Sequence, residues 1–357
     1  MLDPGATIGI VGGGQLGRML AMAAARLGLR TVILEPQADC PAAQVANRQI
    51  EAGYDDAGGL EALAQACDVI TYEFENVPVE AARRLAEWRP VFPAPRALEV
   101  SQDRLVEKQF LNDAGIATAR FAPVATVADL AQALSDFGGQ GILKTRRFGY
   151  DGKGQVRIGA DGPGAAEAFA AIGEAPAILE ARVDFAAEVS VIAARGADGA
   201  FAAYDVAENV HRDGILARST VPARISAELA SQAREAASLL LKALGYVGVI
   251  GVEFFVTRDR GLLANEFAPR VHNSGHWTEA ACAISQFEQH IRAIAGLPLG
   301  QTARHSDCVM ENLIGADVEK AVQILAEPDA VLHLYGKAET RPGRNMGHVT
   351  RLSARSS

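Results

Sequence analysis

The sequence of 357 residues predicts a protein of mixed α/β and α+β class with two or three domains. Three observations lead to this prediction. Strand and helix patterns alternate near the N-terminus, residues 177–222 are rich in strand-forming residues, and residues 247–267 read as a β-hairpin. Apolar residues make up 49% of the chain and charged residues 22%, which is enough apolar material for a sizeable core.

The N-terminal segment has the pattern of a parallel sheet with a crossover helix. Residues 7–12 (TIGIVG) and 31–36 (TVILEP) are short apolar runs typical of buried strands. Between them, apolar residues at helical spacing predict a helix over 15–27 that ends at Gly28. We expect the same sheet to continue through residues 68–74.

The remaining elements are predicted from the same periodicities and from glycine and proline signals. The pattern weakens after Pro298 into a small mixed tail. We expect a proline-rich linker at 89–96, helices at 101–113, 127–137 and 226–244, with Ser226 as the cap of the last, and two strands around a glycine-rich loop within 141–158.

Charge and composition exclude several classes of protein. Lys and Arg number 34 and Asp and Glu 43, so the formal net charge of −9 makes nucleic acid and anionic membranes poor partners. The four cysteines are widely spaced without a C-x-x-C pair, which indicates neither a disulfide framework nor a zinc site. The sequence has no long uncharged apolar run, so we expect a cytoplasmic protein.

A first glycine loop lies between the first strand and the first helix. Its spacing, Gly12-x-Gly14-x-x-Gly17, lets a phosphate approach a helix N-terminus, and Glu35 ends the next strand. This pattern fits a dinucleotide cofactor, another phosphate ligand or a purely structural turn, and the loop alone does not choose among them.

A second glycine loop follows Lys144, which lies in a predicted strand. Residues 149–155 (GYDGKGQ) form a glycine-rich flap whose backbone N–H groups can cover polyphosphate, with Lys144 and Lys153 supplying positive charge. The spacing differs from that of a P-loop. The alternative is an ordinary hairpin turn with a solvated lysine.

Two glutamates form the sharpest signal. If the turn of the 247–267 hairpin is centred between positions 259 and 260, Glu253 and Glu266 are directly opposite and share one face of the sheet. Two facing carboxylates among apolar neighbours require a cation, and oxygen ligands suit Mg²⁺. The alternatives are a one-residue register slip and a general acid/base pair.

Polar groups after the hairpin are further candidates for ligand binding. Arg270 lies four residues after Glu266 and can reach the same phosphate, and Arg341 and Arg344 lie on a fixed turn that suits a phosphomonoester. The alternative for that turn is a solvated basic loop. His211 on its own favours a structural role.

Taken together, these residues resemble the ATP-grasp superfamily and, more narrowly, the 5-(carboxyamino)imidazole ribonucleotide synthetases. The resemblance runs over nearly the whole chain, and its specific parts are YEFENVP at 72–78 and RVHNSGHWT at 270–278. Other matching segments are GGGQLGRM at 12–19, Asp103-Arg104, GYDGKGQ at 149–155, GYVGVIGVEFFV at 245–256 and RPGR at 341–344.

The resemblance implies a Rossmann-like N-terminal domain (1–99), a two-part ATP-grasp domain (100–305) with a mobile lid at about 115–185, and a small C-terminal domain (306–357). It implies that ATP, bicarbonate and 5-aminoimidazole ribonucleotide react through carboxyphosphate in de novo purine synthesis, with Mg²⁺ as cofactor. Members of the family are typically homodimers.

The resemblance also assigns roles to residues at matching positions. Glu253 and Glu266 would hold magnesium, and the catalytic set would be Lys144, Tyr150, Asp151, Lys153, Arg270 and His272. ATP would be bound by Arg104, Lys144, Gly149, Tyr150, Asp151, Gly152, Lys153, Gly154, Gln155, Glu180, Ala181, Arg182, Val183, Glu188, His211, Asn265 and Glu266. The substrate would be bound by Gly14, Gln15, Leu16, Glu73, Asn76, Asn273, Ser274, Arg341 and Arg344.

Two positions depart from the family pattern. Relatives usually carry lysine where this chain has Asn345, which removes one positive charge from the expected phosphate pocket. Lys153 stands where relatives often carry arginine, so the charge is kept but the planar fork is lost.

Three rival functions are weighed against this interpretation. A nicotinamide-dependent oxidoreductase explains the first glycine loop but leaves the flap and the glutamate pair unused. A formate-using transformylase of the ATP-grasp class differs in the acid and the acceptor, and a nucleotide-sensing module would lack turnover.

Overall fold

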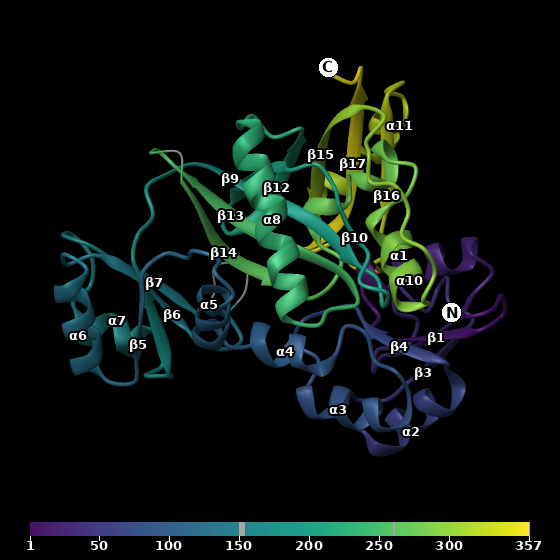
Figure 1. Ribbon diagram of the computed structural model, residues 1–357, viewed down its shortest axis with the longest axis horizontal. Coiled ribbons are helices and arrows are strands. Elements are labelled where there is room, and N and C mark those ends of the chain that lie inside the picture. Colours follow the sequence, from purple (N-terminus) through teal and green to yellow (C-terminus); the bar gives the residue numbers. More distant parts are fainter. Residues whose placement is uncertain (150–153, 260, 357) are drawn as a thin grey trace.

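The computed structural model describes residues 1–149, 154–259 and 261–356, and these residues form three β-sheets. Figure 1 shows the N-terminal sheet, a separate small sheet and a large central sheet, with the C-terminal strands at the far end of the central one. The mixed α/β and α+β class predicted from the sequence is confirmed. No helix among the described residues is long and apolar enough to cross a membrane.

The N-terminal sheet is parallel, with strand order β3-β2-β1-β4. This confirms the predicted strand–helix–strand unit and the continuation of its sheet. The first helix has its buried residues on one stripe, as its spacing indicated. The elements are β1 (Thr7–Val11), α1 (Gln15–Arg26), β2 (Arg30–Leu34), β3 (Arg48–Ile50), α2 (Ala57–Ala66), β4 (Val69–Tyr72) and α3 (Val79–Trp88).

The predicted proline-rich linker is more ordered than expected. Val91 forms a bridge with Ile70 at the edge of the N-terminal sheet, and Pro95 opens helix α4 (Pro95–Ser101), where its missing N–H costs nothing. The next helix, α5 (Arg104–Asp113), begins later than predicted because Asp103 caps it, accepting the N–H groups of Leu105 and Val106.

The small sheet has the order β5-β8-β6-β7 and a hydrophobic core of its own. Its pair β6–β7 is the predicted pair of strands around the second glycine loop. The elements are β5 (Phe121–Val124), α6 (Val127–Asp136), β6 (Gly141–Thr145), β7 (Gln155–Ile158), α7 (Ala165–Ala171) and β8 (Ala177–Glu180).

The central sheet joins nine strands, and alternation along them separates two faces. One face packs on helix α8, which Ser226 caps as predicted. The C-terminal tail is not a separate sheet, because β15 pairs with β12. The strands are β9 (Phe185–Arg195), β10 (Phe201–Ala203), β11 (Ala207–Arg212), β12 (Ile215–Val221), β13 (Gly248–Thr257), β14 (Leu262–Ala268), β15 (Asp307–Ile314), β16 (Ala330–Leu334) and β17 (Asn345–Ser353). The helices are α8 (Ala227–Ala243), η1 (Asn273–Gly275), α9 (Thr278–Ala281), α10 (Gln286–Ile294), η2 (Gly315–Lys320) and α11 (Ala321–Leu325).

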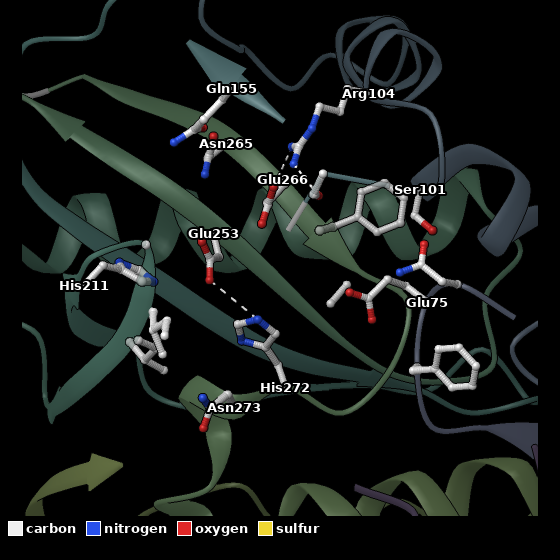
Figure 2. A pocket seen from close by; sticks show the side chains of 18 of the residues that line it. Glu75, Ser101, Arg104, Gln155, His211, Glu253, Asn265, Glu266, His272 and Asn273 are labelled. Carbon is white, nitrogen blue, oxygen red and sulfur yellow. Dashed lines mark hydrogen bonds and ion pairs between the residues drawn. The ribbon is translucent and has the colours of Figure 1, made fainter. Parts of the chain in front are cut away.

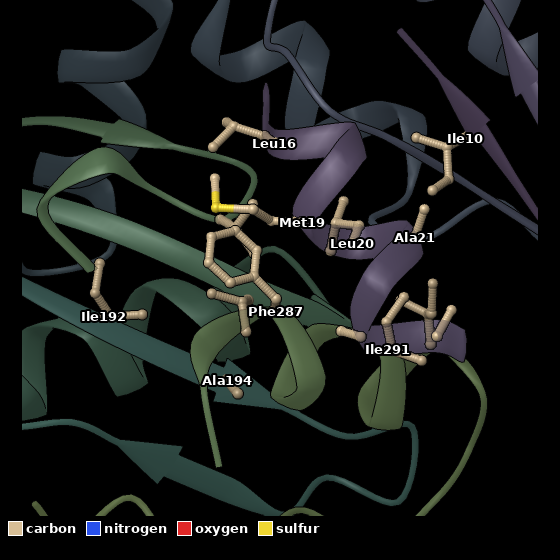
Figure 3. Packing of buried hydrophobic residues seen from close by; sticks show 14 of the residues in the cluster. Ile10, Leu16, Met19, Leu20, Ala21, Ile192, Ala194, Phe287 and Ile291 are labelled. Carbon is tan, nitrogen blue, oxygen red and sulfur yellow. The ribbon is translucent and has the colours of Figure 1, made fainter. Parts of the chain in front are cut away.

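Helix α1 is fastened to the central sheet through α10. Figure 3 shows Met19 and Leu20 of α1 beside Phe287 and Ile291 of α10, with Ile192 of β9 to the left of Phe287. All five side chains are at most 2% exposed. Because each fully buried side chain of this size contributes about 1.5–3 kcal/mol, this contact holds the first glycine loop at a fixed place against the central sheet.

Candidate active site

Two adjoining cavities lie where the three sheets meet. The larger has a volume of about 1350 Å³ and is lined from the N-terminal segment, the small sheet and the central sheet. The smaller, of about 870 Å³, lies beside residues 180–185. Ile142, Lys144 and Phe185 belong to the walls of both, so the two cavities adjoin, and together they are large enough for a nucleotide.

The glutamate pair lies in the larger cavity. Glu253 of β13 is opposite Glu266 of β14, which confirms the predicted pairing. The register near the turn is different from the prediction, because Phe254 pairs with Ala264 and the ladder shifts by one residue at Asn265. Without this bulge Glu266 would face α8, whereas with it Asn265 and Glu266 both point into the cavity beside Glu253 (Figure 2).

The two carboxylates differ in their surroundings. Burial, and next Glu266, raise the pKa of Glu253 to about 7. Burial also acts on Glu266, but Arg104, whose Nη1 lies 3.0 Å from Oε2, and Lys144 outweigh it and lower the pKa of Glu266. A divalent cation between the carboxylates would supply the positive charge that Glu253 lacks. Two carboxylate oxygens facing a wide polar cavity therefore fit Mg²⁺.

Two lysines meet one buried glutamate at the wall of the smaller cavity. Lys144 Nζ lies 2.9 Å from Glu180 Oε2, and Lys108 Nζ lies 3.6 Å from the same oxygen. Lys108 also donates to the carbonyl oxygen of Asn265, 2.8 Å away. Sequence analysis missed Lys108, because a lysine within a helical pattern reads as a solvated residue, yet its side chain is 2% exposed.

The other predicted ATP-binding residues that the structure describes line these two cavities, with the exception of Gly154. Ala181, Arg182 and Val183 follow Glu180 along the wall of the smaller one. Gly149 and Gln155 line the larger one, and Arg104 Nη2 donates to the carbonyl oxygen of Gly149 at 2.8 Å. Gly154 has a positive φ and accepts from the N–H of Thr145. Tyr150, Asp151, Gly152 and Lys153 lie outside the described residues.

His211 and Glu188 form a pair on the wall of the larger cavity. His211 Nδ1 lies 3.0 Å from Glu188 Oε2, and the two residues stand on the neighbouring strands β11 and β9. Burial lowers the pKa of His211, but the hydrogen bond to Glu188 and the charge of Glu253 outweigh it, so the net shift is upward. The histidine is thus held by a partner, and both side chains still face the cavity.

Arg270 and His272 occupy the floor beside the glutamates. Arg270 Nε lies 2.6 Å from Glu75 Oε2; burial alone would raise the pKa of Glu75, but the guanidinium lowers it to about 2. Burial, and next the charge of Arg270, lower the pKa of His272 to about 3, so its ring is neutral. Asn273 lines the cavity beyond it, while the Ser274 side chain is fully buried under His272.

Three amides of the first glycine loop are occupied by glutamate side chains of the protein itself. Both carboxylate oxygens of Glu73 accept from it, Oε1 from Gly14 N–H at 2.9 Å and Oε2 from Gly17 N–H at 3.1 Å. Glu35 accepts from Gly13 N–H at 2.9 Å. These three amides are therefore occupied by carboxylates, which contradicts a pyrophosphate bound at them.

Glu73 and Gly14, both predicted to bind the substrate, instead bind each other. The carboxylate of Glu73 faces the Gly14 and Gly17 amides, and Glu75, two residues later, lines the cavity in its place. The pattern in a single sequence did not distinguish the two glutamates. Gln15, Leu16 and Asn76 line the cavity as expected.

The basic turn near the C-terminus is only partly in the cavity. Arg344 lines it, but Arg341 pairs with Glu339, and its side chain is 68% exposed. Asn345 donates to Asn312 Oδ1 at 3.0 Å, and Lys337 Nζ donates to the Asn345 carbonyl oxygen at 2.6 Å. Lys337, which sequence analysis missed, thus places a cation next to Asn345 on the wall of the cavity.

A nucleotide-sized cavity with paired glutamates, bounded by a small and a large sheet, defines the ATP-grasp class of protein. In agreement, residues 109–287 match the model of the ATP-grasp domain, residues 5–102 that of the ribonucleotide synthetase preATP-grasp domain, and residues 308–357 that of the phosphoribosylaminoimidazole carboxylase C-terminal domain. More narrowly, the chain belongs to the N5-carboxyaminoimidazole ribonucleotide synthase family.

Relatives and solved structures support this membership. The N5-carboxyaminoimidazole ribonucleotide synthase of Brucella melitensis is 69% identical over 355 residues, covering 99% of this chain and 98% of that one. The synthase of Pseudomonas aeruginosa is 46% identical, covering 96% and 93%. An ADP complex of a purK synthetase is 42% identical with a TM-score of 0.95, covering 99% and 94%. The synthase of Aspergillus clavatus in complex with ADP and the aminoimidazole ribonucleotide is 31% identical with a TM-score of 0.92, covering 98% and 94%.

Proposed function

We propose that this protein joins bicarbonate to the amine of 5-aminoimidazole ribonucleotide at the expense of ATP, through carboxyphosphate, as a cytoplasmic enzyme of de novo purine synthesis. The family membership supports the substrates, since a relative of 69% identity carries this name. A single observation carries the proposal: Glu253 and Glu266 lie opposite each other in one cavity. That cavity adjoins a second one at Lys144.

Magnesium would be held by Glu253 and Glu266. When bound, it supplies positive charge against the phosphates of the nucleotide. The protein prepares the site by aiming both carboxylates at one point, with Asn265 beside them on the same bulge.

ATP would lie across both cavities. Residues 180–183 line the smaller one and suit the adenine, while Glu188 and His211 stand where the ribose would enter the larger one. Arg104, Lys144 and the 149–155 loop would hold the phosphates. Arg104 is paired with Glu266 and Lys144 with Glu180, so phosphate oxygens would share these cations with the carboxylates.

The acid and the ribonucleotide would bind on the other side of the glutamates. Arg270, His272 and Asn273 would hold bicarbonate together with Tyr150, Asp151 and Lys153. Gln15, Leu16 and Asn76 would shape the site of the ribonucleotide, with Gly14 and Ser274 behind its wall and the phosphate at Arg344 and Lys337; Arg341 would have to leave Glu339 to take part.

The reaction follows from these placements. A bicarbonate oxygen attacks the γ-phosphorus of ATP, the bond to the bridging oxygen breaks, and ADP leaves. The amine nitrogen then attacks the carboxyl carbon of carboxyphosphate, phosphate leaves, and the nitrogen loses a proton. Arg270 and Lys144 steady the transferred group by charge, and the 149–155 flap would exclude water that otherwise hydrolyses carboxyphosphate.

We further propose the domain limits 1–99, 100–305 and 306–357, with residues 115–185 as the lid, and a homodimer. The matched family ranges and the separate core of the small sheet support the limits. Four of the exposed large apolar side chains, Val322, Leu325, Val331 and Leu334, lie on α11 and β16 and support an interface there.

A phosphate-release assay tests the function. ATP, bicarbonate and 5-aminoimidazole ribonucleotide together should give rapid release, and omission of any one should reduce it to background. Replacing bicarbonate by formate tests the transformylase, and NADH fluorescence titration tests the oxidoreductase, which the occupied amides of the first glycine loop already disfavour. Release that needs no ribonucleotide would contradict the proposal.

A further inference from the structure

A row of buried polar side chains runs across the central sheet to His272. Ser219 of β12, Asn209 of β11, Ser190 of β9 and Ser274 of η1 are at most 5% exposed. The links are short: 2.7 Å from Ser219 Oγ to Asn209 Oδ1, 2.9 Å from Asn209 Nδ2 to Ser190 Oγ, 2.7 Å between the Oγ atoms of Ser190 and Ser274, and 2.8 Å from Ser274 Oγ to His272 Nδ1. We call these four residues the relay.

The contacts at the His272 end indicate the direction of donation along the relay. The backbone N–H of Ser274 points toward His272 Nδ1 from 3.4 Å, a long contact that favours an Nδ1 without a proton. The Ser274 hydroxyl then gives its hydrogen to Nδ1, and its oxygen accepts from Ser190.

The amide of Asn209 fixes the other end. Its Nδ2–H donates to Ser190, whose own hydrogen is already given to Ser274, and its Oδ1 accepts the hydrogen of Ser219. Turning this amide over would reverse every link and bring a hydrogen from Nδ1 toward Ser274 Oγ. The backbone N–H of Ser274 lies 3.4 Å from Nδ1 and adds to the preference for the first direction, while the hydroxyl of Ser274 makes the shorter contact.

We propose that Ser190, Asn209 and Ser219 are positioning residues that act through Ser274 to hold His272 as the Nε2-protonated tautomer. The Nε2 atom lies 3.5 Å from Glu253 Oε1, so its hydrogen is directed at the glutamate pair (Figure 2). Ser190 also pairs in register with Glu253 across β9 and β13, which ties the relay to the same strand position.

The fixed tautomer gives the site a neutral hydrogen-bond donor whose direction does not vary. With Nδ1 protonated instead, a lone pair would face the Glu253 carboxylate and any anionic oxygen bound beside it. The effect on turnover rests on the proposed function, because it requires an acid substrate next to His272. The tautomer itself does not.

The tautomer is read directly by nuclear magnetic resonance of the full-length protein with ¹⁵N-labelled histidine rings. The His272 signals are assigned by their loss in the His272→Gln variant. We expect the correlation pattern of a ring protonated at Nε2. A ring protonated at Nδ1, or a mixture of the two, in the unaltered protein would overturn the proposal without any activity measurement.

Asn209→Asp then tests the relay at nearly constant shape. A carboxylate has no N–H, so Ser190 must turn its hydrogen toward position 209, and the Ser274 hydroxyl must turn toward Ser190 and away from His272. We expect a mixed tautomer and a kcat lower by about ten- to a hundredfold, as for other groups that orient a functional histidine, with the KM for ATP unchanged.

The matched control is Asn112→Asp, the same chemical change at an exposed position near the end of α5. It should alter neither the ring signals nor kcat. An Asn209→Asp protein with the original tautomer and full kcat refutes the relay. A protein that never carboxylates the ribonucleotide refutes the proposed function instead, and the spectrum of the unaltered protein still decides the tautomer.

Discussion

At the scale of the residue, the buried carboxylate of Glu253 faces Glu266 and lowers the stability of the folded protein unless a cation binds between them. Its raised pKa of about 7 means that the folded chain keeps a proton that the unfolded chain releases from near pH 4.5 upward. The free energy of unfolding therefore falls progressively as the pH rises from 4.5 to 7. Its side chain is 16% exposed, so solvent screening reduces this cost little.

We therefore predict that Glu253→Gln stabilises the metal-free protein at pH 8 by on the order of 1–3 kcal/mol, and hardly at all near pH 4.5. The same change should greatly reduce ATP turnover, and the double variant with Glu253→Gln and Glu266→Gln should abolish it. Urea unfolding at the two pH values and the phosphate-release assay measure these effects. Glu235→Gln, at an exposed position of α8, is the control. Near-normal turnover in the double variant would refute the metal assignment.

Lys337 is the second residue whose role the structure suggests. Burial, and next Arg344, lower its pKa to about 8, so the ammonium is charged at neutral pH and loses its charge above pH 8. We predict that Lys337→Met raises the KM for the ribonucleotide about ten- to a hundredfold, since a hydrogen bond to a charged group contributes about 1.5–3 kcal/mol.

The KM of the unaltered protein should also rise as pH increases through 8, and the Lys337→Met variant should lack this rise. Steady-state kinetics at pH 7 and pH 9 measure both effects. Lys320→Met removes an exposed lysine that pairs with Asp317 and should change neither value. An unchanged KM in the Lys337→Met variant would leave Arg344 as the cation of the phosphate site.

At the scale of the element, strands and helices were predicted well where their periodicity was strong. The hairpin of β13 and β14 shows the limit. The glutamates face each other as predicted, but through a bulge at Asn265 that a centred turn does not imply. Counted in regular alternation from Ala264, which pairs with Phe254, Glu266 would lie on the α8 face, and no local pattern distinguishes a bulge from a regular strand.

The contact between α1 and α10 can be tested at the same scale. We predict that Phe287→Ala destabilises the protein by about 3–5 kcal/mol, because the ring is 1% exposed and the alanine leaves a cavity between the two helices. The urea midpoint measures the loss. Leu239→Ala, at a position 42% exposed on α8, should shift it little. Equal shifts would mean that α1 does not depend on this contact.

At the scale of the whole molecule, the sequence predicted the three regions but not how they share residues. Lys337, near the C-terminus, and Gln15, in the first helix, line one cavity. Arg146, at the end of β6, reaches back to Asp103 at the start of α5 with contacts of 2.9 and 2.7 Å. Pairs so distant in sequence carry no local signal, so Lys108, Glu75 and Lys337 emerged only from the structure.

The proposed homodimer is a further property of the whole molecule. Val322 and Leu325 of α11 are 80% and 67% exposed, which is costly for a monomer and suited to an interface between two copies. We predict that light scattering gives twice the monomer mass for the unaltered protein and the monomer mass for Leu325→Glu, since a charge in an apolar interface is costly to bury. Leu239→Glu, on the exposed side of α8, should remain dimeric. A monomeric unaltered protein would contradict the dimer, and a dimeric Leu325→Glu variant would move the interface elsewhere.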